Sequence, residues 1–149
     1  MRVEVYRNLH KQCWSVRALE GPQKGRVIAH EHDFILEACS YAVQPAGRDK
    51  VRRTGRKNVH AFIRGTLPSE PMVMWPGARG VTYNPYKHDG FVLEAIATKV
   101  TGQSKYLDAG DNWVGQSSAV RFCADGRVLE GFAKRARPPL PSPFRWGEG

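Results

Sequence analysis

Apolar and polar residues alternate with a period of two over several short stretches, and this alternation predicts a chain built mainly from β-strands. Val3 and Val5 alternate with charged residues, and Trp14 and Val16 repeat the pattern a few positions later. A loop with Gly and Pro then leads into Arg26–His32, which has the character of a third strand. We expect the second and third strands to form a hairpin.

The rest of the chain continues in short strands separated by turn residues. Within 58–64, Val59, Ala61 and Ile63 are expected on one face, with His60, Phe62 and Arg64 on the other. The Asp125-Gly126 pair predicts a tight hairpin between its two flanking strands. Loops are expected over 66–80 and 98–118, where Trp113 is the expected apolar anchor. The further strands are expected over residues 34–43, 58–64, 81–83 (paired with 91–97), 119–124 and 127–132.

One helix is predicted, over Pro45–Thr54. Proline suits the first turn of a helix, and Gly55 stands where a C-terminal glycine belongs. Arginines 48, 52 and 56 recur at every fourth position, which places them on one stripe of a helix. A basic loop is the alternative, because the segment has few apolar residues to bury.

These elements predict a mainly β protein, α+β at most. The chain of 149 residues suits one domain, and no strand–helix–strand spacing indicates a parallel sheet. The expected architecture is a curled antiparallel sheet or a small barrel with one short basic helix. We expect residues 1–133 to form the β-rich domain and residues 134–149 to form a basic, Pro-rich tail.

Charge adds a class of partner to this picture. The formal net charge is +9, from 23 Lys and Arg against 14 Asp and Glu, and 15 of the 23 cations are arginines. Arginine pairs bidentately with phosphate and carboxylate groups and stacks on flat rings. The segment 48–64 alone has a balance of +6. The expected partners are therefore nucleic acid or an acidic protein surface, and a solvated charged turn is the plain alternative.

Nucleic-acid binding is the leading functional hypothesis. Its expected stacking residue is Phe62, placed on the polar face of its strand. Zinc-finger, RNP and GxxG readout motifs are not found in the sequence. Pro139, Leu140, Pro141 and Pro143 also fit a polyproline ligand, which gives the tail a second possible role. The expected phosphate contacts are Arg48, Lys50, Arg52, Arg53, Arg56, Lys57 and Arg64, with Lys134, Arg135 and Arg137 of the tail adding reach.

Two histidines give a third hypothesis. His30 and His32 would share one face of a strand, and Glu37 follows them. HxH followed by four residues and Glu resembles the first metal motif of the cupin barrels, and this resemblance implies a metal-dependent barrel enzyme. The second cupin motif, PxG followed by His, is missing, because Pro76-Gly77-Ala78 has no His in range.

The remaining signals describe the compartment and the chemistry. The three cysteines are far apart without a CxxC motif, which is typical of reduced thiols in a cytoplasm. No apolar run has the length that a membrane span needs. The loop 83–89 carries Tyr, His, Lys and Asp but lacks a nucleophile elbow or phosphate loop. We therefore expect no enzyme activity, no cofactor and no membrane partner.

Four phrases of the sequence resemble a family of proteins. They are VEVYRNLHKQCWSVR, GRVIAH, GRKNVHAF and TYNPYKHDGF, and together they are similar to short uncharacterised proteins of phages and prophages. The resemblance implies a small accessory protein of a phage or mobile element. It also implies the alternative of an anti-CRISPR-like inhibitor that binds a host defence or nucleic-acid-processing complex, with Trp75, Tyr83 and Tyr86 as its anchors.

Overall fold

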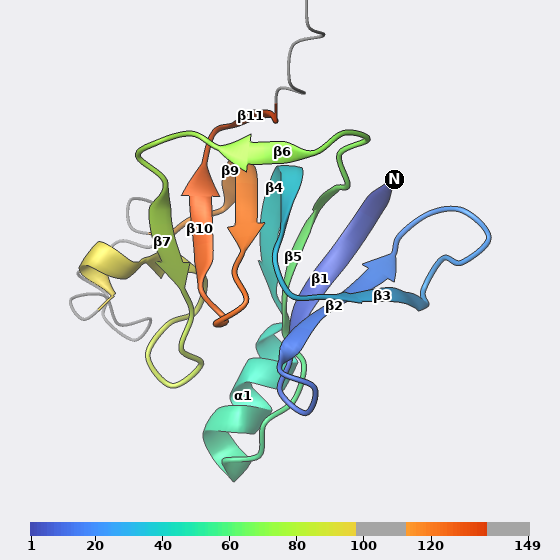
Figure 1. The fold of residues 1–149 in the computed structure, drawn as a ribbon. Helices are drawn as coiled ribbons and strands as arrows, with labels where there is room; N and C mark the ends of the chain where they lie inside the picture. Colours follow the sequence, from blue (N-terminus) through green and yellow to red (C-terminus); the bar gives the residue numbers. More distant parts are fainter. Residues whose placement is uncertain (98–112, 137–149) are drawn as a thin grey trace, which may run out of the picture.

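A single antiparallel sheet of nine strands dominates the computed structural model, which describes residues 1–97 and 113–136 (Figure 1). The strand order is β3-β2-β1-β5-β4-β9-β10-β7-β8, so the N-terminal and C-terminal halves of the chain meet where β4 pairs with β9. The strands of this sheet are β1 (Arg2–Asn8), β2 (Cys13–Ala18), β3 (Val27–Glu31), β4 (Phe34–Val43), β5 (Ala61–Thr66), β7 (Arg79–Thr82), β8 (Val92–Leu93), β9 (Gln116–Phe122) and β10 (Val128–Gly131).

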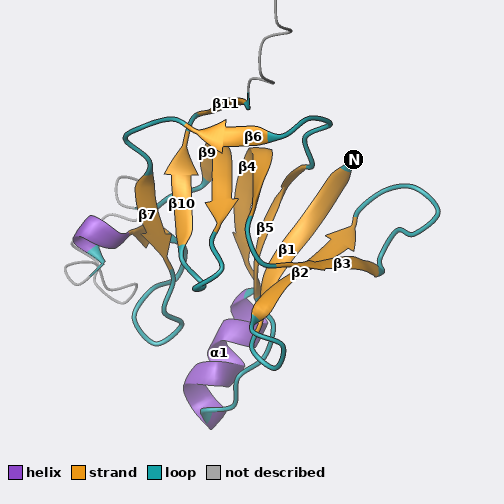
Figure 2. Ribbon diagram, viewed as in Figure 1, coloured by secondary structure: helices purple, strands orange, loops and turns teal. Residues whose placement is uncertain are grey.

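The remaining elements lie at the two ends of the sheet. A two-stranded ribbon of β6 (Met72–Met74) and β11 (Ala133–Arg135) crosses one end, and the helix α1 (Pro45–Thr54) lies at the opposite end (Figure 2). A single 3-10 turn, η1 (Glu94–Ile96), follows β8. The mainly β class predicted from the sequence is confirmed. The sheet is open, because β3 and β8 do not pair with each other in the described part of the chain, and the alternative of a small barrel is wrong.

The predicted hairpins form where the turn residues place them. β2 pairs with β3, β7 pairs with β8, and β9 pairs with β10 across the Asp125-Gly126 turn. Gly126 has a φ of 95°, a conformation that costs glycine little and other residues more. The sequence pattern therefore predicts local pairings well.

Four segments differ from the predicted pattern. The strand expected over 91–97 is much shorter, because β8 ends at Leu93 and residues 94–96 form η1. Strand β5 begins at Ala61, so Val59 precedes it and is 48% exposed. Strand β6 lies within the loop expected over 66–80, and β9 begins inside the loop expected over 98–118. Strands β5, β6 and β9 are made by pairing with partners that are distant in the chain, which local sequence does not reveal. Residues 98–112 of the second expected loop lie outside the described residues; Trp113, at its end, bridges to Val92.

The core lies along the long central strands. Val3, Val5 and Val16 are almost completely buried, and Phe122 is fully buried at the centre of an aromatic group. The ring of Phe122 stacks on Phe34 at 4.7 Å and meets the edge of Trp14 at 5.0 Å. Burying a side chain of this size contributes about 1.5–3 kcal/mol, so these strands hold most of the apolar stabilisation.

The helix α1 forms with little apolar contact. Val51 is its one buried residue, and Gly55 ends the helix in the left-handed region with a φ of 72°, where its N–H binds the Val51 carbonyl. The predicted helix and its glycine cap are confirmed. Because the apolar face is so small, polar contacts must hold α1 in place.

Gly65 gives a test of the packing between β5 and β4. A Cβ atom at this position would lie 2.8 Å from the Glu37 carbonyl oxygen and 2.9 Å from Cys39 Sγ. We expect Gly65→Ala to lower the free energy of unfolding by about 1–3 kcal/mol, measured by urea denaturation. Gly115→Ala is the matched control, because nothing lies within 4 Å of its Cβ position. Equal effects of both substitutions would contradict the close packing described.

Candidate nucleic-acid interface

Two arginines of α1 clamp the helix onto the loop that follows β7. Arg52 Nη2 lies 2.8 Å from Asp89 Oδ1 and donates to the His88 carbonyl at 3.2 Å, and its Nε donates to the Pro85 carbonyl. Arg48 Nη1 lies 3.5 Å from Asp89 Oδ1 and donates to the Asp89 carbonyl at 3.3 Å. One carboxylate and three backbone carbonyls therefore bind and orient two guanidinium groups.

The loop has its own internal structure. Asn84 begins it, with its side chain accepting from the Tyr86 N–H at 2.9 Å and its carbonyl accepting from the His88 N–H at 2.8 Å. The His88 ring is 2% exposed; its Nδ1 accepts from the Asn84 N–H, so its Nε2 donates to the Ala97 carbonyl at 3.0 Å. These bonds hold Tyr86 at the outer end of the loop, where it is 52% exposed.

A second polar contact lies beneath the clamp. The His60 ring is 5% exposed; its Nε2 lies 2.7 Å from the Tyr83 hydroxyl and its Nδ1 lies 2.9 Å from Asn58 Oδ1. Burial lowers the pKa of His60, and burial raises the pKa of Tyr83 to about 12. Both groups are therefore uncharged at neutral pH, with Nδ1–H donating to Asn58 and the Tyr83 hydroxyl donating to Nε2.

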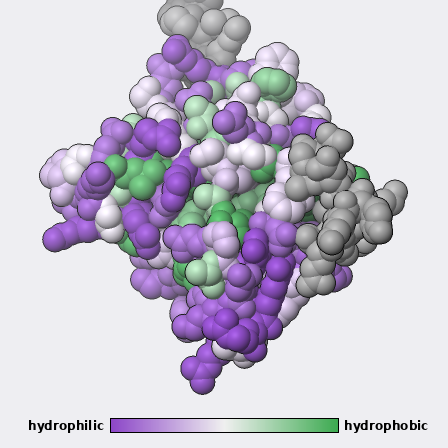
Figure 3. Space-filling model, turned by 180° about the vertical axis from the view of Figure 1, so that it is seen from behind, coloured by the Kyte–Doolittle hydropathy of each residue, from purple (hydrophilic) through white to green (hydrophobic). Residues whose placement is uncertain are grey.

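Four cations stay on the outside of α1 and of the segment after it. Lys50, Arg53, Arg56 and Lys57, here called the basic tip, are all exposed, and no carboxylate of the described residues pairs with any of them. Figure 3 shows a continuous hydrophilic surface at the lower end of the molecule, where α1 lies in Figure 1. The exposed Tyr86 and Lys87 belong to the loop clamped against the same helix.

The structure therefore divides the predicted phosphate-binding residues. Besides Arg48 and Arg52, Arg64 is engaged internally, with its Nε 2.8 Å from Glu4 Oε2. Glu4 is buried and also binds Arg17 at 3.2 Å, so one carboxylate is shared by two arginines and holds the Arg64 side chain in place. The basic tip keeps four of the seven cations that the sequence singled out, all between positions 50 and 57 of the chain.

Alternation within its strand predicts that Phe62 lies on an exposed face, but the structure buries this side chain. It is 4% exposed, and its ring meets the edge of Tyr6 at 6.1 Å. The side chain of Tyr6, on the neighbouring strand β1, covers this face of β5 at Phe62. The expectation that Phe62 stacks on a base is wrong; Tyr86, on the loop that the clamp holds against α1, is an exposed aromatic ring.

The tail cations lie elsewhere. Lys134 Nζ lies 5.1 Å from the centre of the Trp75 ring, and Arg135 Nε lies 2.9 Å from Glu70 Oε2. Both belong to β11 at the end of the sheet opposite α1 (Figure 1), and Arg137 lies outside the described residues.

The three residues expected to anchor a protein partner are not brought together. Trp75 is 49% exposed and follows β6 at the ribbon end of the sheet, whereas Tyr86 lies near α1. Tyr83 is half-buried against Phe91, with ring centres 5.3 Å apart, and its hydroxyl is used by His60. Of these three residues, only Trp75 and Tyr86 present large exposed surfaces.

The predicted metal ligands do not form a site. Strand β3 ends at Glu31, so His32 lies in a turn and does not share a strand face with His30. The His30 ring contacts Ser15 Oγ at 3.2 Å and Lys11 Nζ at 3.5 Å. Within 1–97 and 113–136, no group of three or more His, Cys, Asp or Glu residues is arranged to hold a metal ion, so the grouping of His30, His32 and Glu37 is wrong.

Comparison with known proteins decides the family. A family model described as Mycobacterium phage L5 gene 82 protein matches residues 1–112. The chain belongs to this family. The "Gene 82 protein" of Mycobacterium phage L5 is 48% identical over 98 residues, which cover 62% of this chain and 77% of that protein. No solved structure matches the chain.

The family assignment confirms the phage resemblance predicted from the sequence. The matched part of the chain contains α1, the basic tip and the loop 84–89, and it ends before β9. The match names a phage family and adds no activity. No helix among the described residues is long and apolar enough to cross a membrane.

Adjacent arginines provide a test of the clamp. Arg52→Met removes the donor for two loop carbonyls and the partner of Asp89, so we expect the free energy of unfolding to fall by about 1–3 kcal/mol. Arg53→Met is the matched control, with an expected effect within about 0.5 kcal/mol, because Arg53 is exposed. Urea denaturation of both variants measures the difference. A loss at Arg53 as large as that at Arg52 would show that the clamp is not specific.

The His60 contact predicts a pH dependence of stability. Because folding lowers the pKa of His60 below its ordinary value of 6.5, the unfolded chain binds the proton more readily. This contribution to stability is fully present above about pH 6.5 and is lost as the pH falls below it. We expect His60→Gln to flatten this part of the dependence, measured as urea midpoints between pH 8 and 5. The exposed His32→Gln is the control, and an unchanged slope in His60→Gln would refute the assignment.

Proposed function

We propose that this protein is a small nucleic-acid-binding accessory protein of a phage, and that the basic tip contacts the phosphate backbone. The observation that carries the proposal is that the cations of α1 and of the segment after it fall into two groups, one ion-paired and one exposed. Arg48 and Arg52 form ion pairs with Asp89. The four cations of the basic tip, by contrast, remain exposed on α1 and on the segment that follows it. The clamp holds these cations on a fixed support, which lowers the entropy lost when they bind a polyanion.

The charge density supports a polyanion as the partner. Lys50 and Arg53 are three positions apart on the helix, which brings their Cβ atoms to about 5–6 Å, and phosphates of one DNA strand are about 7 Å apart. A structural role at the helix C-terminus accounts for part of this charge. Cations there interact favourably with the helix dipole by about 0.3–1 kcal/mol, but this effect falls off within the last turn. Arg56 and Lys57 lie beyond that turn.

Tyr86 supports single-stranded nucleic acid in particular. Its ring is 52% exposed on a loop that the same clamp fixes to α1. Aromatic rings beside a basic surface stack on unpaired bases without strong sequence preference. The basic tip would bind the phosphates and Tyr86 would bind a base.

Salt dependence and substitution test the proposal together. With four phosphate contacts, the log–log slope of affinity against salt is expected near −3 for single strands and between about −3 and −4 for duplex DNA. Fluorescence anisotropy with a labelled oligonucleotide measures it. Arg53→Gln with Arg56→Gln should reduce the magnitude of the slope by about 2. Lys24→Gln with Arg26→Gln removes two exposed cations of the β2–β3 loop as the control.

Tyr86 is tested separately. Tyr86→Ala should weaken binding of single strands by about 1–3 kcal/mol, Tyr86→Phe should retain it, and duplex affinity should change little. Two results would sink the proposal: a flat salt dependence of the wild-type chain, or equal losses in the basic-tip variant and in the control variant.

A second function is favoured by a different surface. Val73, Trp75 and Phe132 are 41%, 49% and 67% exposed, and β6 and β11 pair so that these side chains share the outer face of the ribbon. An exposed apolar face with a tryptophan is typical of a protein-binding hot spot. In this alternative the chain inhibits a host complex. A stoichiometric host protein retained from nuclease-treated lysate by the wild type, and lost in Trp75→Ala with Phe132→Ala, would support it.

A further inference from the structure

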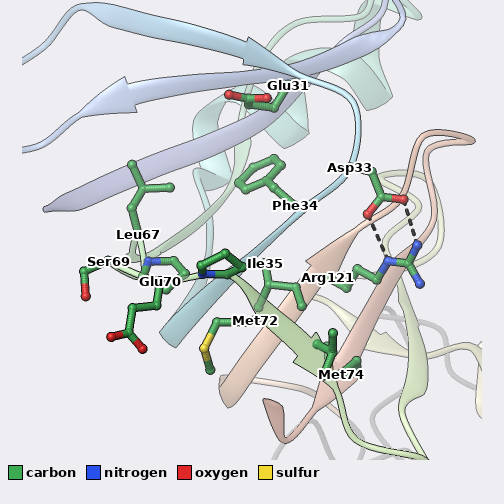
Figure 4. Close-up of a pocket in the computed structure, with 13 residues that line it drawn as sticks. Glu31, Asp33, Phe34, Ile35, Leu67, Ser69, Glu70, Met72, Met74 and Arg121 are labelled. Atoms are coloured by element: carbon green, nitrogen blue, oxygen red, sulfur yellow. Dashed lines mark hydrogen bonds and ion pairs between the residues drawn. The ribbon is translucent and has the colours of Figure 1, made fainter. Parts of the chain in front are cut away.

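A groove lies between the start of β4 and the segment that contains β6 (Figure 4). It has a volume of about 750 Å³ and is open to solvent on one side. Its walls are largely apolar, with Phe34, Ile35, Leu67, Met72 and Met74 all half-buried. Half-buried apolar walls on both sides of an open groove can cover apolar side chains of an extended segment.

The polar groups of this groove are mainly acidic. Glu31, Asp33 and Glu70 line it, against the single cation Arg121. Arg121 is occupied by Asp33 through two bonds of 3.0 and 2.8 Å. Glu31 is exposed and has no ion-pair partner in the part of the chain that the structure describes. In a chain with a net charge of +9, this groove therefore favours a cationic and apolar occupant.

The path of the chain leads to the rim of the same groove. Strand β11 pairs with β6, and Arg135 binds Glu70 of the groove wall at 2.9 Å. The N–H of Ala136 then donates to the carbonyl of Pro71, another lining residue, at 2.8 Å. The next thirteen residues read RPPLPSPFRWGEG, with two arginines, four prolines, Leu140, Phe144 and Trp146. Their length, up to about 40 Å if extended as polyproline II, is more than enough to reach back along the groove.

We propose that the groove is the docking site of the chain's own C-terminal segment, residues 137–149. The apolar side chains of the segment cover the groove walls, and one of its arginines pairs with Glu31. Tethering at Ala136 keeps the segment at a high effective concentration, of the order of millimolar for a short linker. This advantage favours the chain's own segment over a separate peptide of similar sequence.

The methionines provide the probe. The chain has three, Met1, Met72 and Met74, and two of them line the groove. In the full chain labelled with ¹³C at methionine methyl groups, Phe144→Ser with Trp146→Ser should shift the Met72 and Met74 signals, because two aromatic rings leave their surroundings. The Met1 signal should stay in place. Tyr86→Ser, which removes an exposed ring from the loop beside α1, is the control and should move neither groove signal.

Docking within one chain also requires that the Met72 and Met74 signals do not depend on protein concentration. Unchanged Met72 and Met74 signals in the double variant would overturn the proposal. Signals that change with concentration, together with a doubled mass in solution, would overturn it in favour of a second copy as the source of the segment. Signals that shift and stay constant on dilution support docking within one chain.

Limited proteolysis of the full chain gives a second measurement, which tests the charge complementarity between the groove and the segment. Trypsin can cut after Arg145, and docking should slow this cut. Glu31→Lys should accelerate cleavage after Arg145 several-fold, because a cation in the groove repels the arginines of the segment. Glu20→Lys makes the same charge change on an exposed loop outside the groove and should leave the rate unchanged. Equal rates in the two variants would contradict the proposal.

Discussion

The ion pairs of Arg52 and Arg48 with Asp89 are the constraint on which the candidate site depends. The helix α1 buries a single apolar residue, Val51, so its position cannot come from a hydrophobic face. Two guanidinium groups instead bind one carboxylate and the carbonyls of the loop 84–89. Charge-assisted bonds of this kind are stronger than neutral ones, and the partial burial of both arginines limits screening by water. The clamp fixes the direction of the helix, and with it the direction of every cation on its outer side.

The sequence predicts the elements better than it predicts the roles of their residues. The helix boundaries, the Gly55 cap and the Asp125-Gly126 hairpin follow from local chemistry and are found as predicted. Arg52 and Arg53 look equivalent in the sequence, yet one is bound to Asp89 and the other is exposed. The difference arises from a contact across 37 positions of the chain, which no local pattern contains. The turn signals of Asn84-Pro85 and Asp89-Gly90 predict a loop at this place, but not that α1 packs on it.

Phe62 shows the complementary error. Alternation places it opposite Ile63, and the opposite face was expected to be solvated. In the folded chain Phe62 is buried on this face, where it meets Tyr6 in a second layer of side chains. Glu4, Arg17 and Arg64 form a salt-bridge group on this layer. Internal ion pairs of this kind reduce the number of unpaired cations available to a partner, which total charge alone does not show.

The two ends of the sheet have opposite character, and this arrangement links the two proposals. Cations and one exposed aromatic ring gather at the α1 end, within the part of the chain matched by the phage family. The ribbon of β6 and β11 and its acidic groove lie at the other end. The proposed polyanion site and the proposed docking groove of the C-terminal segment therefore lie at opposite ends of the sheet, so the two proposals do not require competition for one surface.

NMR of the arginine side chains tests directly whether the exposed cations, and not the ion-paired arginines, contact nucleic acid. In ¹⁵N-labelled protein, the Nε–H signals of Arg53 and Arg56 should shift when a short single-stranded oligonucleotide is added at low salt. The signals of Arg52 and Arg64 should stay in place, because their Nε–H groups are already bound to the Pro85 carbonyl and to Glu4. Shifts at Arg52 and Arg64, or no shift at Arg53 and Arg56, would contradict the account.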